Sequence, residues 1–183
     1  EVLRIAARYG LPDAVADAEG IRRLLRRVDA VPVSLAVAQA ISESGWGRSR
    51  FARKGNALFG QWTWDPASGI VPAARPEGRL HRVRAFRTLT DSAHAYLFNL
   101  NTHPAYRGFR EARAAARAET GGLLSGRALA GYLGRYSERR QAYVEDIVAL
   151  IRQNQLGRLD AAVLGEPSRY ADADPLAAGL VDG

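Results

Sequence analysis

The feature that most constrains the fold is an apolar segment that begins at Pro32 and ends before Gly45. Proline is favoured in the first turn of a helix, where its missing N–H would have no partner, and glycine commonly follows the last helical residue. Between them, apolar residues such as Leu35, Ala38 and Ile41 lie almost all round the helical circumference. A helix of this pattern is buried. We therefore expect a mainly α-helical core built around it.

The rest of the chain predicts further helices and one region of a different kind. Apolar residues recur at helical spacing in five stretches: residues 1–30 (two short helices broken at Gly10), 91–100, 107–119, 126–133 and 139–154. Asp91 is expected to cap the helix that starts beside it. Residues 60–86 alternate and contain turn signals, which predicts one or two short β-hairpins. The expected fold class is mainly α (α+β), with a small β-hairpin element.

A chain of 183 residues accommodates one domain comfortably. We expect a helical N-terminal extension over residues 1–30, packed on a central domain of residues 31–157. Residues 158–183 are rich in Ala, Gly, Asp and Pro, which predicts an irregular C-terminal tail.

Composition excludes several classes of function. The chain has no cysteine, which excludes a disulfide framework, a thiolate zinc site, an iron–sulfur cluster and a cysteine nucleophile. The three histidines show no zinc-binding spacing, so we expect no metal and no cofactor. No apolar run is long enough to predict a membrane span.

The charge of the chain favours an anionic partner. The formal net charge is +7, and it is concentrated before Gln155, because from there onward five acids face two arginines. Such a body favours nucleic acid, an anionic membrane surface or an acidic cell-wall polymer. Nearly all of the basic residues are arginine, a bias that a GC-rich genome also produces. Nucleic-acid binding rests on charge alone, and we do not expect it.

Glu43 is the residue best suited to acid catalysis. It follows the buried apolar run, and a carboxyl held away from water has a raised pKa, which suits it to donate a proton near neutrality. The alternative is a solvated or ion-paired glutamate at a helix end. Gly45 and Gly47 let the chain turn away and leave room for a ligand. Trp46 between them is either a sugar-stacking platform or a core residue.

These residues belong to a longer pattern that resembles glycoside hydrolase family 73, the bacterial cell-wall β-N-acetylglucosaminidases of the lysozyme-like superfamily. The resemblance covers about residues 30–154, and the string of residues 99–106 is similar to the Bax-type proteins of Gram-negative bacteria. Its motifs are the segments 32–47, 49–52, 56–62, 83–92, 99–106, 135–138 and 143–147.

The resemblance implies a lysozyme-like fold with a β element beside a cleft, and it implies roles for individual residues. Glu43 falls on the position of the general acid. Tyr136 falls on a tyrosine that lines the cleft opposite and places the N-acetyl group of the substrate or stabilises charge on the sugar. The residues expected to bind substrate are Trp46, Asn56, Phe59, Gly60 and Trp62.

The sequence departs from the family pattern at the second carboxylate, since no acid stands squarely at that position. Glu77 is the nearest acid and Asp65 the next. Three routes stay open. Glu77 or Asp65 acts as the base, the 2-acetamido group of the substrate acts as nucleophile, or Glu43 works alone and yields an anhydro-sugar, as in lytic transglycosylases.

The resemblance implies an enzyme that cleaves the β-1,4 bond between N-acetylglucosamine and N-acetylmuramic acid in peptidoglycan. The glycan strands of peptidoglycan are then the partner, and the bacterial periplasm or cell envelope is the expected location. A non-catalytic peptidoglycan-binding domain is the alternative, because the second carboxylate is missing.

Overall fold

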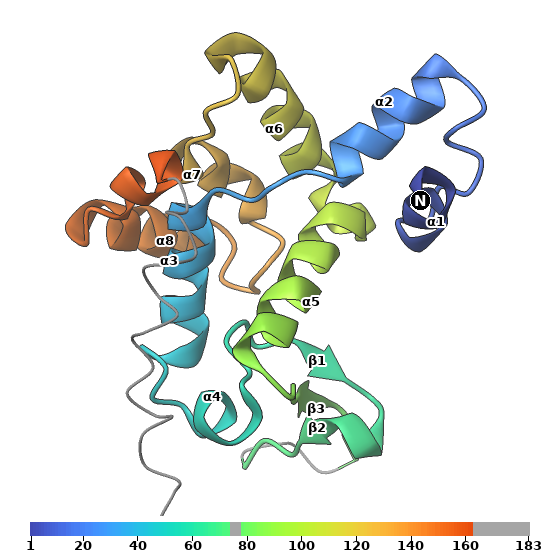
Figure 1. The fold of residues 1–183 in the computed structure, drawn as a ribbon. Coiled ribbons are helices and arrows are strands. Elements are labelled where there is room, and N and C mark those ends of the chain that lie inside the picture. Colours follow the sequence, from blue (N-terminus) through green and yellow to red (C-terminus); the bar gives the residue numbers. More distant parts are fainter. Residues whose placement is uncertain (74–77, 163–183) are drawn as a thin grey trace, which may run out of the picture.

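The computed structural model describes residues 1–73 and 78–162 of the chain. The predicted fold class is confirmed: the protein is mainly α-helical, with a small antiparallel sheet at one end (Figure 1). The α-helices are α1 Val2–Arg8, α2 Ala18–Arg27, α3 Val33–Ser44, α4 Arg50–Gly55, α5 Leu89–Thr102, α6 Arg107–Thr120, α7 Gly126–Leu129 and α8 Gln141–Gln153. The 3₁₀ helices are η1 Pro66–Ser68, η2 Pro104–Tyr106, η3 Ala130–Leu133 and η4 Leu156–Ala161. The strands are β1 Trp62–Thr63, β2 Gly69–Ile70 and β3 Arg82–Arg84.

Helix α3 has the predicted ends and the predicted central position. Pro32 is its N-cap, and Gly45 ends it in the left-handed conformation with φ 56°. Leu35 and Ala38 are fully buried against α7, α8 and η4. Val33 at the N-terminal end is exposed, so the helix is not covered along its whole length. Figure 1 shows α7 and α8 beside α3, with α4 and the sheet beyond its C-terminal end.

The start of α3 is fixed to the end of the described chain by one carboxylate. Asp160 in η4 accepts hydrogen bonds from the backbone nitrogen of Ser34 at 2.9 Å, from its hydroxyl at 2.7 Å, and from the backbone nitrogen of Gly126 at 2.9 Å. A Cβ at Gly126 would lie 2.7 Å from the backbone nitrogen of Leu35. Any residue other than glycine at position 126 would therefore collide with α3. Residues 158–161, which the sequence assigned to the C-terminal tail, belong to η4. Residues 163–183 of that tail lie outside the described residues.

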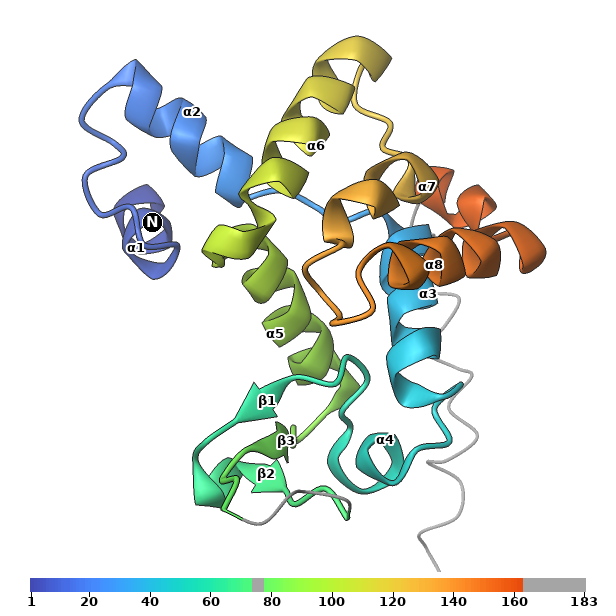
Figure 2. The same cartoon turned by 180° about the vertical axis from the view of Figure 1, so that it is seen from behind.

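The β-element predicted in residues 60–86 forms one three-stranded antiparallel sheet of order β1-β3-β2. Val83 in the central strand pairs with Trp62 on one side and with Ile70 on the other. Helix α5 follows the sheet and runs toward α6, as Figure 2 shows from behind. The cap of α5 is Thr88 rather than the predicted Asp91. Asp91 instead accepts from the backbone nitrogen of Thr88 at 3.1 Å, which completes a capping box.

The two N-terminal helices have a small apolar cluster of their own, formed by Ala6, Ala14 and Leu24. Tyr9 contacts Phe98 of α5, with ring centroids 5.4 Å apart. None of the helices in the described part of the chain is both long enough and apolar enough to cross a membrane.

A buried charge cluster fastens the segment between α2 and α3 to α6. Arg113 is fully buried and donates to the backbone oxygens of Arg26, Asp29 and Ala30. Its Nε lies 3.2 Å from a carboxylate oxygen of Asp29, which also pairs with Arg117 at 2.6 Å. Burial of a guanidinium is tolerated here because acceptors surround it.

Candidate active site

Glu43 lies in the last turn of α3, where the helix gives way to the loop that leads to α4. Its carboxyl borders a hollow of about 540 Å³ between the helical body and the start of the sheet. The other residues that line this hollow come from three segments: Phe59, Gly60, Gln61 and Trp62; Asn99 and Tyr106; and Tyr136, Ser137, Glu138 and Arg139. The site therefore combines residues far apart in the sequence around one carboxyl group.

The loop before β1 approaches the carboxyl group very closely at Gly60. Gly60 has φ +60°, and a Cβ there would lie 2.9 Å from Oε2 of Glu43. A side chain at this position would both strain the backbone and displace the carboxylate. Glycine at position 60 thus leaves Glu43 open to the hollow.

Aromatic rings form the wall behind Glu43. Phe59 is stacked on Tyr96 with ring centroids 4.0 Å apart. Tyr136 is stacked on Tyr143 at 5.7 Å and with an interplanar angle of 4°. The hydroxyl of Tyr136 donates to the backbone oxygen of Phe59 at 3.0 Å, which joins the helical body to the segment before the sheet. Phe59 and Tyr136 thus bring the aromatic core of the helical body to the hollow that Glu43 borders.

The environment of Glu43 favours its protonated form. Burial raises the pKa of Glu43, whereas a hydrogen bond with the hydroxyl of Tyr143 acts in the opposite direction. Burial also raises the pKa of Tyr136 and Tyr143, and the nearby charge of Glu43 adds to the increase. The tyrosines are therefore neutral at physiological pH, and each hydroxyl acts as a hydrogen-bond donor or acceptor.

The predicted substrate-binding residues divide into two groups. Phe59, Gly60 and Trp62 line the hollow, and Trp62 is 57% exposed with its ring stacked on His81 at 4.5 Å. Trp46 and Asn56 are not among the described residues that line it. Trp46 is exposed and has φ 59°, so it is not the core residue that the sequence allowed as an alternative.

Asn56 connects two segments of the backbone rather than lining the hollow. Its side-chain nitrogen donates to the backbone oxygens of Phe86 at 3.1 Å and Arg87 at 3.0 Å, which fastens the end of α4 to the segment after β3.

The candidates for a second carboxylate do not share one position. Glu77 lies outside the described residues. Asp65 is exposed and caps η1 by accepting from the backbone nitrogen of Ala67 at 2.9 Å, an interaction that lowers its pKa. Glu138, to which sequence reasoning assigned no role, borders the same hollow as Glu43. The sequence feature that could have pointed to Glu138 is its position two residues after Tyr136, in the same motif.

Sequence reasoning also assigned no role to Gln39, Asn99, Tyr106 and Tyr143, although all four lie within the motifs that carry the family resemblance. The available signal was helical spacing, since Gln39 precedes Glu43 by one turn and shares its face of α3. Nothing in the sequence shows that α5 and α8 pack against that face.

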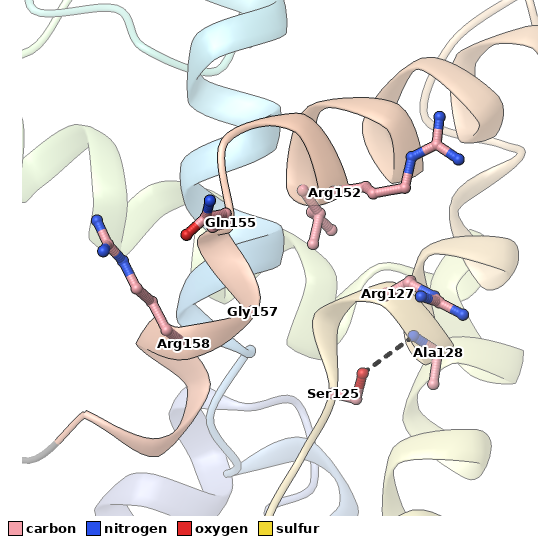
Figure 3. A pocket seen from close by; sticks show the side chains of 8 residues that line it. Ser125, Arg127, Ala128, Arg152, Gln155, Gly157 and Arg158 are labelled. Carbon is pink, nitrogen blue, oxygen red and sulfur yellow. Dashed lines mark hydrogen bonds between the residues drawn. The ribbon is translucent and has the colours of Figure 1, made fainter.

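Other features of the described residues do not suggest a catalytic site. No group of three or more metal-binding side chains comes together within residues 1–73 and 78–162. A larger hollow of about 710 Å³ lies between the start of α7 and η4. Among the described residues, its lining includes Arg127, Arg152 and Arg158 but no carboxylate, and Figure 3 shows the Arg158 side chain directed away from the other two. The described residues around this hollow therefore offer no general acid.

Fold and site together define the class of protein. A mainly helical, lysozyme-like domain that presents a half-buried glutamate on an aromatic hollow, next to a small sheet, has the architecture of a glycosidase. The chain belongs to the glucosaminidase family, which is described as mannosyl-glycoprotein endo-β-N-acetylglucosaminidase and matches residues 18–156.

One curated relative extends this result. The chain is 37% identical over 139 residues to "Protein bax" of Escherichia coli (strain K12), an alignment that covers 76% of this chain. The chain spans about half of that relative, since the aligned part is 48% of its length. No solved structure matches the chain significantly.

Proposed function

We propose that this protein is a peptidoglycan hydrolase that cleaves the β-1,4 bond between N-acetylglucosamine and N-acetylmuramic acid, with Glu43 as the general acid. The observation that carries the proposal is the position of the Glu43 carboxyl, half-buried at the edge of an aromatic hollow in a glucosaminidase-family domain. A raised pKa keeps this carboxyl protonated closer to neutral pH, as protonation of a glycosidic oxygen requires.

The open hollow suits a sugar polymer. Trp62 in β1 presents an exposed ring on which a pyranose face can stack, and Tyr136 lines the same hollow. In this proposal Tyr136 places the N-acetyl group or stabilises charge on the sugar, while its hydroxyl holds the Phe59 segment in place. The excess of arginine attracts the carboxylates of peptidoglycan. The corresponding location is the bacterial periplasm or cell envelope.

The route after protonation depends on the second group. Retaining glycosidases hold their two carboxyls about 5–5.5 Å apart and inverting ones about 6.5–9.5 Å. Glu138 on the hollow, Glu77 and Asp65 are the carboxylates to test. The acetamido group of the substrate and Glu43 acting alone are the other two routes.

The test is mass spectrometry of the fragments released from purified peptidoglycan by the wild-type protein and by Glu43→Gln. Fragments that end in reducing N-acetylglucosamine, absent with the variant, are the expected result. Anhydro-muramyl ends would replace the proposal with a lytic transglycosylase. Binding to sacculi without any release would leave a non-catalytic peptidoglycan-binding domain.

Three further variants, Glu77→Gln, Asp65→Asn and Glu138→Gln, identify the second group. If one of these carboxylates is the catalytic base, its replacement by the amide should lower kcat about 10²-fold or more. If all three variants keep wild-type kcat and still release reducing ends, the acetamido route is supported.

A further inference from the structure

A chain of buried hydrogen bonds begins one helical turn before Glu43. Gln39 is fully buried, and its side-chain amide has a partner at each end. Its oxygen accepts from the hydroxyl of Tyr96 in α5 at 2.6 Å. Its nitrogen donates to the hydroxyl oxygen of Tyr143 in α8 at 2.8 Å. Because Tyr96 donates to the amide oxygen, the nitrogen end of the amide faces Tyr143.

This arrangement decides how Tyr143 can bond. Its hydroxyl oxygen accepts from Gln39, so its own proton is available for another partner. The carboxyl of Glu43 lies one helical turn beyond Gln39 on the same face of α3, and its interaction with the Tyr143 hydroxyl opposes the rise that burial causes in the pKa of Glu43. Glu43 is therefore the candidate acceptor for the free proton of Tyr143.

We propose that Gln39 is a positioning residue, which fixes the hydroxyl of Tyr143 as a donor to the carboxyl of Glu43. A neutral carboxylic acid has one O–H group and one oxygen that only accepts. A donor at Tyr143 occupies the accepting oxygen, which leaves the acidic proton on the oxygen directed to substrate. The role in proton transfer rests on the proposed function, whereas the hydrogen-bond order does not.

Four other titratable or charged side chains near Glu43 could also affect its titration: Tyr106, Tyr136, Glu138 and Arg139. Tyr106 of η2 and Tyr136 are neutral, because burial raises the pKa of both phenols. Arg139 borders the hollow and pairs with Asp146 at 2.6 Å. Glu138 is the other carboxylate among the described residues that line it, and the variants below leave it in place.

The first measurement is the pKa of Glu43 in the protein without substrate. It is read from the ¹³C NMR signals of labelled glutamate carboxyls as the pH is changed, and the Glu43 signal is identified by its absence in Glu43→Gln. In Gln39→Met the amide is replaced by an apolar chain of similar length. The oxygen of Tyr143 then lacks a donor and accepts the proton of Glu43, which stabilises the protonated acid. We expect the pKa of Glu43 to rise in this variant.

A double-mutant cycle identifies the pathway of the effect. Tyr143→Phe should also raise the pKa of Glu43, because a donor to the carboxylate is lost. Adding Gln39→Met to Tyr143→Phe should then cause no further rise. Ser34→Ala is the matched control: it removes a buried hydrogen bond of 2.7 Å from the other end of α3 and should leave the titration unchanged.

Kinetics on peptidoglycan gives the second readout. Gln39→Met should lower kcat about tenfold with little change in KM, and should move the basic limb of the pH profile to higher pH, since the acid must be protonated. If Gln39→Met does not fold, Gln39→Asn keeps the amide but is one methylene too short to span both tyrosines, and the same shifts are expected.

Two results would overturn the proposal. One is a Gln39 variant that loses thermal stability but keeps the wild-type titration of Glu43, which is what a purely structural glutamine would give. The other is an equal rise in pKa with and without the hydroxyl of Tyr143. Both are read without substrate, so they remain decisive even if the wild-type protein releases no peptidoglycan fragments.

Discussion

At the scale of single residues, the contact between Gly60 and Glu43 sets the shape of the site. We expect Gly60→Ala to lower kcat/KM at least tenfold, because the new methyl group would lie 2.9 Å from Oε2 of Glu43. The left-handed φ of +60° should also cost the folded state about 1 kcal/mol. Activity assays and urea denaturation measure the two effects separately. Gly134→Ala is the control, since its Cβ would meet no atom within 4 Å and its φ is negative.

The buried carboxyl of Glu43 also predicts a pH-dependent stability. Its pKa is higher in the folded than in the unfolded chain, so no difference arises at low pH, where both states are protonated. As the pH rises above the unfolded value of 4.5, the wild-type protein loses stability until the folded pKa is passed. We expect Glu43→Gln to match the wild-type Tm at pH 4 and to exceed it at pH 8. An equal difference at both pH values would contradict the burial effect, and the exposed Glu145→Gln serves as the control.

At the scale of elements, the N-terminal end of the helix that carries Glu43 depends on Asp160. Asp160→Ala removes the acceptor for the first turn of α3 and for the start of α7. We expect the free energy of unfolding to fall by about 2 kcal/mol, since each lost cap costs about 1 kcal/mol. Chemical denaturation measures this change. Asp146→Ala, which breaks an ion pair exposed on both sides, should stay within about 1 kcal/mol of the wild type.

The elements differ in how far the sequence predicts them. Helix α3 was predictable because Pro32, Gly45 and the apolar run between them are local signals. The sheet order was not, since β3 lies between β1 and β2 only through pairing across a long connection. The cap of α5 was misassigned because Thr88 and Asp91 are both good caps, and the capping box uses both.

The site shows the same division. Glu43, Phe59, Gly60, Trp62 and Tyr136 were predicted from motifs, and the structure brings them to one hollow. The pairing of Gln39 with Tyr96 and Tyr143 depends on how α3, α5 and α8 pack, which no local pattern specifies. Trp46 stands in the same motif as Glu43, yet it has a positive φ and is not among the described residues that line the hollow.

At the scale of the whole molecule, the net charge of +7 predicts a salt effect on encounter with an anionic polymer. The Debye length, over which charges act on one another in solution, is about 10 Å at 0.1 M salt and shorter at higher salt. We expect kcat/KM on peptidoglycan to fall several-fold between about 50 and 200 mM salt, while hydrolysis of a neutral chito-oligosaccharide stays constant. Parallel rate measurements on the two substrates check this. An equal decrease on both would assign the salt effect to the catalytic step instead.

The contact of Gly126 with α3 bears on which side of the hollow can move. Because Gly126 lies against Ser34 and Leu35, and Asp160 bonds to both α3 and the start of α7, a shift of α3 relative to α7 would break these contacts. In the facing segment, residues 59–62, Phe59 is held by its stacking on Tyr96 and by the hydrogen bond from Tyr136 to its backbone oxygen, whereas Trp62 at the other end is 57% exposed. We therefore expect a polymer strand that widens the hollow to displace the exposed end of this segment, at β1, rather than the helix that carries the acid.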